Sequence, residues 1–354
     1  MTKKTKKTPS IYVTKPFLAP LKDYNDLLKD IWDCGILTND GQFVNQFENL
    51  ICKKFGLTNY ITFSSGTTAL QAAIKGLELE GEIITTAFTW IATVSAIKNE
   101  RCKPIFCDID EDTLNIDIKK IENHITDKTV AIMPVHVFGN PCDIDGIKKI
   151  ANRYNLKVIY DAAHAIGSEY NGKSILSYGD ISALSTHATK LLNSGEGGGC
   201  IAKNKIITDK LRSIRFFGYN YDKSDILFDG LNGKLTELQS ALGIVNLKYI
   251  DKVISDREMK YQYYYSALRD NPALRFQKIK FGNTNYSYFP IIIESKKKLF
   301  KVIDKLNTYN IYPRRYFYPS VNIFKNIVDS DERKISERVA NHIICLPLFY
   351  DLEL

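Results

Sequence analysis

The 354-residue sequence predicts an α/β fold, with a mainly parallel sheet in a large domain and a smaller α+β domain after it. Short runs of β-branched residues alternate with helical stretches as far as about residue 205, which is the order of a parallel sheet. A long helical stretch begins near residue 250 and strand-like and helical segments follow it. We therefore expect a basic, disordered tail at 1–10, a large domain at 11–249 and a small domain at 250–354.

The first elements are two helices joined by a loop. Residues 11–18 are extended because they combine β-branched residues with Pro16. Apolar residues then recur on one helical face from Leu21 to Asp33, and a second helix runs from Phe43 to Phe55. The glycine-containing segment 35–41 predicts a turn-rich loop between them.

The remaining elements follow from the period of the apolar residues. The predicted strands are 60–63, 83–86, 104–110, 130–137, 158–160, 286–293 and 345–348. The predicted helices begin near 66 and 87 and cover 116–125, 235–249, 251–271 and 298–307.

One stretch, 158–200, carries most of the chemical information. Its strand ends at Asp161, Lys190 follows a polar segment with Ser185, and a glycine-rich loop occupies 195–199. A carboxylate at a strand end and a lysine that can lose its proton are what a Schiff-base cofactor such as pyridoxal phosphate requires. Asp161 would keep the pyridine nitrogen protonated, and Lys190 would bind the aldehyde and then move a proton. Taken singly, the aspartate could be a turn former and the lysine a solvated side chain.

Two further segments suit the same cofactor. Gly66 and Thr67 stand where a strand turns into a helix, so the helix N-terminus could bind a phosphate, although any capped helix looks alike. Trp90 offers a flat face to a pyridine ring, although an aromatic residue here could equally belong to the core.

The ordered motif set resembles the DegT/DnrJ/EryC1/StrS family of pyridoxal phosphate-dependent sugar aminotransferases. The matching segments are Asp161-Ala162-Ala163-His164-Ala165, Gly179-Asp180, Leu184 to Lys190 and Gly195-Glu196-Gly197-Gly198. The resemblance implies an aspartate aminotransferase-like, fold type I transferase. It also assigns roles: Asp161 at the ring nitrogen, His164 near the ring hydroxyl, Ser185 at the phosphate and Lys190 as the covalent anchor.

The resemblance extends to the subunit interface and the substrate. Gly66, Thr67 and Trp90 match cofactor contacts, and Asn232 matches an asparagine that reaches the phosphate of the partner subunit's cofactor. The resemblance at Asn232 therefore implies a homodimer with shared active sites. Asp40 stands where the family has glycine, His164 where many members have glutamine, and Lys234 where an arginine is usual.

The substrate-binding candidates are polar or aromatic. The cluster at 312–319 combines anion donors with stacking rings, as a nucleotide diphosphate would demand, although a solvated loop is the alternative. The candidates are Thr38, His187, Glu196, Arg314, Arg315, Tyr316 and Tyr318.

The resemblance implies that L-glutamate supplies nitrogen to a nucleotide-linked keto sugar. The segments VTKPFL, STHATK, GLNGK and RRYFYP look most like family members that use dTDP-4-keto-6-deoxyglucose, for O-antigen or a related glycan. A 3-keto sugar or a UDP- or GDP-sugar is the alternative. A sugar dehydratase of the family is disfavoured because Lys190 is present. A non-catalytic dimer that binds cofactor or nucleotide is the alternative from another class.

Composition argues against other classes. The net charge is +8, but Lys3, Lys4, Lys6 and Lys7 supply four of the charges and no RNA-binding motif is visible, so we expect no nucleic-acid partner. The seven cysteines lack C-x-x-C spacing, which predicts no metal site. The absence of a long apolar run and of a signal-peptide core predicts a cytoplasmic protein without a membrane partner.

Overall fold

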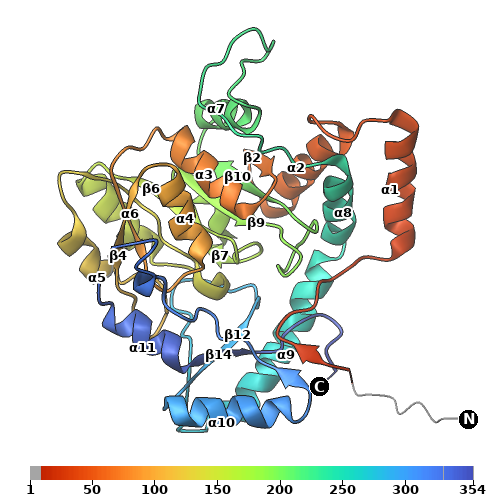
Figure 1. Cartoon of the computed structure of the whole chain (residues 1–354). Helices are drawn as coiled ribbons and strands as arrows, with labels where there is room; N and C mark the ends of the chain where they lie inside the picture. The colour runs from red at the N-terminus through yellow and green to blue at the C-terminus, as the bar shows by residue number, and fades with distance from the viewer. Residues whose placement is uncertain (1–8, 330, 354) are drawn as a thin grey trace, which may run out of the picture.

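Figure 1 shows the computed structural model, which describes residues 9–329 and 331–353. A seven-stranded sheet in the order β2-β10-β9-β6-β5-β3-β4 lies at its centre. Its neighbours pair in parallel except at β10, which runs antiparallel to β2 and β9. The expected α/β class with a mainly parallel sheet is confirmed. The strands are β2 (Tyr60–Phe63), β3 (Glu82–Thr86), β4 (Lys103–Cys107), β5 (Thr129–Ile132), β6 (Lys157–Asp161), β9 (Ile181–Ser185) and β10 (Gly198–Ala202).

Helices cover both faces of this sheet. Because successive strand residues point to opposite faces, Ile159 joins a core cluster with α3 and α4, whereas Val158 and Tyr160 join one with α2, α6 and α8. The helices of this part are α1 (Leu21–Cys34), α2 (Gln42–Phe55), α3 (Gly66–Gly76), α4 (Ile91–Asn99), α5 (Ile118–Ile121), α6 (Ile144–Arg153), α7 (Lys205–Arg215) and α8 (Glu237–Leu247). Short 3₁₀ turns lie at Glu122–His124, Val137–Gly139 and Ile175–Ser177, and a small hairpin at β7 (Glu169–Tyr170) and β8 (Lys173–Ser174).

The C-terminal part is built on a three-stranded antiparallel sheet in the order β11-β12-β14. The first strand of the chain, β1, pairs with β13, so the chain begins beside its C-terminal part (Figure 1). The division at residues 249 and 250 stays a prediction. The elements are β1 (Ile11–Tyr12), α9 (Ile250–Leu268), β11 (Leu274–Phe276), β12 (Phe289–Ile293), α10 (Lys296–Asn307), β13 (Ile311–Tyr312), a 3₁₀ turn at Val321–Ile323, α11 (Lys334–His342) and β14 (Ile343–Leu346).

Local chemistry explains where several elements start and stop. Helix α1 ends at Gly35, whose φ of 68° places it in the left-handed region that favours glycine. Thr236 caps α8, and Gln239 returns the bond to complete a capping box. Strand β5 ends at Ile132, earlier than expected, just before Pro134, which has no N–H for a ladder bond. Helix α4 begins at Ile91 and not at residue 87, because the Ala87 carbonyl accepts from Val321 N at 3.0 Å.

Most of the predicted basic tail lies outside the residues that the structure describes. Residues 1–8 of the expected tail lie outside the described residues, and Pro9 and Ser10 are exposed. Between residues 9 and 353, residue 330 excepted, no helix is long and apolar enough to cross a membrane. Over the same residues, no three side chains of the metal-binding types form a cluster.

Candidate active site

A cavity of about 250 Å³ opens at the carboxyl ends of β6 and β9, the edge where parallel sheets bind ligands. The start of α3, the segment before α4 and the segment after β13 complete its wall. The sheet therefore gathers residues that are far apart in the sequence. The predicted site residues that line the cavity are Gly66, Thr67, Trp90, Asp161, His164, Ser185, His187, Lys190, Glu196, Arg314 and Tyr316.

Asp161, the last residue of β6, is a buried carboxylate with a fixed orientation. Its Oδ2 accepts a hydrogen bond from Thr93 Oγ1 at 2.7 Å, and its Oδ1 accepts from Ala163 N at 3.1 Å. Burial raises the pKa of Asp161, and the two hydrogen bonds and the Lys190 charge only partly oppose that effect. Such a carboxylate is well placed to hold a proton on a basic ring nitrogen, because the resulting charge pair would relieve its desolvation.

Lys190 reaches the same cavity from the turn after β9, where its backbone N–H donates to the His187 carbonyl at 2.8 Å. Desolvation lowers the pKa of Lys190 to about 8; the Asp161 charge opposes this effect and the Arg314 charge adds to it. At pH 7 roughly a tenth of such amines are uncharged, far more than for an ordinary lysine. Lys190 can therefore act as a nucleophile and as an acid or base near neutral pH.

The start of α3 forms a cradle at the other end of the cavity. Ser65 caps the helix by accepting from Thr68 N at 3.1 Å, while Gly66 and Thr67 line the cavity with the unpaired first turn of the helix. A Cβ at Gly66 would lie 2.8 Å from Ser185 Cβ, so only glycine lets the helix approach β9 this closely. A Cβ at Gly198 would lie 2.6 Å from Gly66 N, which explains part of the glycine-rich run. Gly198 and Gly199 belong to β10 and not to a loop.

His164 and Trp90 form two walls of the cavity. The His164 ring lies nearly parallel to those of Phe138 and Phe317, and desolvation lowers its pKa far enough to keep the imidazole neutral. The Trp90 indole is about half exposed and meets the edge of Tyr316 at 6.2 Å between ring centroids. His136, which lies in the predicted strand 130–137 but beyond the end of β5, is buried against Tyr160 and does not line the cavity.

Two charged side chains lie at the mouth of the cavity, the guanidinium of Arg314 and the carboxylate of Glu196. The Arg314 guanidinium lies 4.4 Å from the centroid of the Tyr316 ring and is exposed, so its N–H groups can bind an anion that enters the cavity. Two further lining residues, His187 and Glu196, form a pair, with His187 Nε2 3.4 Å from Glu196 Oε1, and His187 Nδ1 lies 2.8 Å from Thr189 Oγ1. The mouth can therefore discriminate both charge and hydrogen-bonding groups of a ligand.

Four predicted residues are not brought to this cavity. Arg315 does not line the cavity and instead donates to the carbonyls of Ala340 and Asn341 in α11. Tyr318 lies against Arg315, with the guanidinium 3.3 Å from its ring centroid. Thr38 and Asn232 lie on surface segments before α2 and α8.

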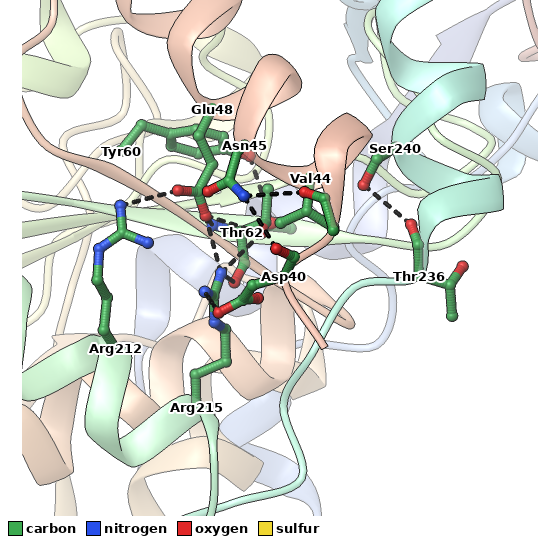
Figure 2. A network of polar contacts seen from close by, with 12 residues as sticks. Asp40, Val44, Asn45, Glu48, Tyr60, Thr62, Arg212, Arg215, Thr236 and Ser240 are labelled. Atoms are coloured by element: carbon green, nitrogen blue, oxygen red, sulfur yellow. Dashed lines mark hydrogen bonds and ion pairs between the residues drawn. The ribbon is translucent and has the colours of Figure 1, made fainter. Parts of the chain in front are cut away.

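A buried charged network supports the loop that carries Thr38 (Figure 2). The fully buried Arg215 pairs with Glu48 at 2.8 Å and with Asp40 at 2.6 Å, and it also donates to the Thr62 hydroxyl. Asp40 therefore makes an ion pair that a glycine at this position could not make. Its φ of 61° keeps the left-handed conformation that glycine would adopt, and its carboxylate ties the loop to Arg215 at the end of α7.

The chain matches the DegT/DnrJ/EryC1/StrS aminotransferase family over residues 21–354. It is 39% identical over 352 residues to a dTDP-4-amino-4,6-dideoxy-D-glucose transaminase of Shigella dysenteriae, with 97% of this chain and 95% of that protein covered. The chain belongs to the DegT/DnrJ/EryC1/StrS aminotransferase family. It is therefore an aminotransferase, as the sequence motifs predicted.

Two solved structures share the fold of this chain. DesI, solved in the presence of its TDP-sugar product, superposes with a TM-score of 0.92 at 27% identity and covers 98% of this chain and 90% of its own. NtdA of Bacillus subtilis, solved with bound cofactor PMP, superposes with a TM-score of 0.86 at 27% identity and covers 93% and 77%. The expected fold type I architecture is confirmed.

Two threonines that support the candidate residue Asp161 were not predicted from the sequence. Thr93 binds Asp161 from 68 residues away, and Thr89 in turn bonds to Thr93 at 2.8 Å between the two hydroxyls. The two threonines are four positions apart, and they lie where α4 begins beside Trp90. Only this proximity to a predicted cofactor contact could have pointed to them.

Proposed function

We propose that the chain binds pyridoxal phosphate and transfers the amino group of L-glutamate to dTDP-4-keto-6-deoxy-D-glucose, giving dTDP-4-amino-4,6-dideoxy-D-glucose. The observation that carries this proposal is that Asp161 and Lys190, an acid of raised pKa and an amine of lowered pKa, line one cavity. The 39% identity to a transaminase of that name, over nearly both chains, supports the sugar.

The residues present fit the cofactor. Asp161 would bind its ring nitrogen, the α3 cradle and Ser185 its phosphate, and Trp90 one face of its ring. His164 would hydrogen-bond to the ring hydroxyl, because its buried imidazole lines the cavity and desolvation keeps it neutral. When bound, the cofactor supplies an electron-withdrawing ring that stabilises negative charge on the carbon that exchanges nitrogen.

The chain's own residues would bind, orient and move protons. Lys190 would take a proton from one reacting carbon and return it to another, because a pKa of about 8 lets the amine do both near neutral pH. Asp161 would hold the ring nitrogen in its protonated form throughout, since Thr93 and Ala163 fix the position of both its oxygens.

Arg314 is our candidate for an anionic part of the two substrates. Its guanidinium stands over Tyr316 at the cavity mouth, where a carboxylate or a diphosphate would enter. His187 and Glu196 on the opposite side would bind hydroxyl groups of the sugar. Arg315 and Tyr318 are not part of this proposal, because Arg315 donates to the Ala340 carbonyl and Tyr318 packs against the Arg315 guanidinium.

We further propose a homodimer with shared active sites. Asn232 and Thr38 do not line the cavity of their own chain, and several large apolar side chains near Thr38 are exposed, namely Trp32, Ile36 and Leu37. Asn232 would therefore reach the cofactor phosphate of the partner subunit. The dimer would work in the cytoplasm and supply an amino sugar for a surface polysaccharide such as O-antigen.

A substrate panel tests the function. The protein is incubated with pyridoxal phosphate, L-glutamate and 3-keto or 4-keto sugars carried on dTDP, UDP or GDP, and products are identified by mass spectrometry and NMR. We expect an amine at C4 of the dTDP sugar. Amination of a 3-keto sugar, or preference for UDP or GDP, would change the substrate. Turnover of none of them by protein that binds the cofactor would refute the proposed reaction.

A further inference from the structure

Behind the cavity wall, three buried side chains each carry a polar atom without a hydrogen-bond partner among the described residues. These atoms are His164 Nδ1, Tyr288 Oη and Arg257 Nε. The three residues are only 9%, 4% and 2% exposed. Buried polar atoms in native proteins are nearly always paired, so three neighbouring unpaired atoms require an explanation.

The Tyr288 ring lies against the His164 ring, and Arg257 binds the carbonyl of the residue before Tyr288. The rings of Tyr288 and His164 lie 4.9 Å apart between centroids, at an angle of 48°. Burial raises the pKa of Tyr288, and the Arg257 charge is among the effects that oppose this rise. The Tyr288 hydroxyl therefore keeps its proton and lies within the field of the Arg257 guanidinium.

Backbone contacts hold this group together. Asn285 Nδ2 donates to the His164 carbonyl at 2.7 Å, and Ser287 Oγ donates to the same carbonyl at 3.1 Å. Arg257 Nη1 in turn donates to the Ser287 carbonyl at 3.0 Å. The segment that carries Tyr288 is thus fixed to the His164 turn at one end and to α9 at the other.

The three unpaired atoms are chemically complementary in order. Arg257 Nε–H can only donate, a tyrosine hydroxyl can accept and donate, and a neutral imidazole has one nitrogen that can only accept. His164 is neutral because desolvation lowers its pKa well below the ordinary value. Two hydrogen bonds in series, one between Arg257 and Tyr288 and one between Tyr288 and His164, would give each of the three atoms a partner.

We propose that Arg257, Tyr288 and His164 form this relay, in which Arg257 Nε donates to Tyr288 Oη and Tyr288 Oη donates to His164 Nδ1. Because no two of these atoms are hydrogen-bonded to each other in the structure, each link runs through one buried water, which can bridge polar groups of this kind. The single proton of the imidazole then lies on Nε2. Stacking on Phe138 and Phe317 fixes the plane of the ring but cannot choose between the two nitrogens.

The relay gives Tyr288 a positioning role that acts through His164. With its proton held on Nε2, His164 presents an N–H donor to the cavity, and this donor suits an anionic oxygen on the ring of a bound cofactor. This last step rests on the proposed function, whereas the relay itself concerns only this chain.

Magic-angle-spinning NMR of the full-length protein labelled with ¹⁵N-histidine tests the relay without the cofactor. His164→Gln identifies the His164 signals among those of the five histidines. We expect His164 to be neutral with an unprotonated Nδ1 and a protonated Nε2. Tyr288→Phe removes the donor to Nδ1, so we expect the other tautomer to become populated.

A matched control separates this effect from general perturbation. Tyr286→Phe also removes a phenolic hydroxyl two residues away, but that hydroxyl binds Glu258 at 2.8 Å. We expect the control to leave the His164 signals unchanged. A protonated Nδ1 in the wild type would overturn the relay whether or not any variant folds, and so would an unchanged tautomer in a folded Tyr288→Phe protein.

Titration with pyridoxal phosphate, followed by absorbance, tests the link to the cofactor. Losing one well-placed hydrogen bond should weaken cofactor binding in Tyr288→Phe about 10-fold, with no change in Tyr286→Phe. Equal affinity of the two variants would overturn the positioning role. If the wild type does not bind pyridoxal phosphate but shows the predicted tautomer, the proposed function fails and the relay stands.

Discussion

Replacement of Lys190 by methionine should stabilise the cofactor-free protein. The lysine and methionine side chains are similar in length, but methionine has no charge to desolvate. Burial in the cavity lowers the pKa of Lys190 from 10.5 to about 8. At about 1.36 kcal/mol per pKa unit this corresponds to at most about 3 kcal/mol of destabilisation. We expect about 1–2 kcal/mol at pH 7, because the side chain is only partly buried.

The sign of the pH dependence follows from the direction of the shift. The unfolded state binds more protons than the folded state between the folded pKa of about 8 and the ordinary value of 10.5. The penalty is therefore complete below about pH 8 and disappears as the pH rises toward 10.5. The advantage of Lys190→Met should shrink by about 1–2 kcal/mol between about pH 7 and about pH 10.

Urea unfolding followed by circular dichroism at the two pH values measures this difference. The control is Lys173→Met, which changes an exposed lysine and should alter stability by less than about 0.5 kcal/mol at both values. If Lys190→Met is no more stable than the wild type at pH 7, or its advantage does not change with pH, the amine is not desolvated and the reasoning is wrong.

Three further substitutions test other parts of the site. Thr93→Val removes a hydrogen bond to a buried carboxylate, worth about 1.5–3 kcal/mol, so turnover should fall about 10- to 100-fold. The control Thr208→Val, which loses a bond to the carbonyl of Asn204 at the start of α7, should leave kcat unchanged. Asp40→Asn should lower the free energy of unfolding by only about 1–2 kcal/mol, because Glu48 still neutralises the buried Arg215. The control Asp251→Asn breaks an exposed pair with Lys54, and an equal loss of stability in the two variants would contradict the role of Asp40. Asn232→Ala should weaken retention of pyridoxal phosphate if the site is shared, and unchanged affinity in equilibrium dialysis would count against the shared site.

The elements of the site that the sequence predicted are those set by local pattern. The apolar run of β6 and its stop at Asp161 follow from strand periodicity, and the Ser65 cap and Gly66 follow from the chemistry of a helix start. These features depend on residues within a few positions of one another. Their placement at one sheet edge then follows from the parallel order of the strands.

What the sequence could not predict depends on contacts between distant segments. The bond from Thr93 to Asp161 spans 68 residues, and the side of the segment to which Arg315 turns depends on α11. The role of Asp40 required the position of Arg215, which lies 175 residues away. Each of these contacts is decided by tertiary packing, which no local pattern records.

The central claim is that Asp161 and Lys190 hold one cofactor between them. The most direct test is to incubate the protein with pyridoxal phosphate, reduce it with borohydride, digest it and locate the pyridoxyl group by mass spectrometry. The account predicts that the group is on Lys190 and that L-glutamate added before reduction prevents the labelling. A group on any other lysine, or labelling that glutamate does not prevent, would contradict it.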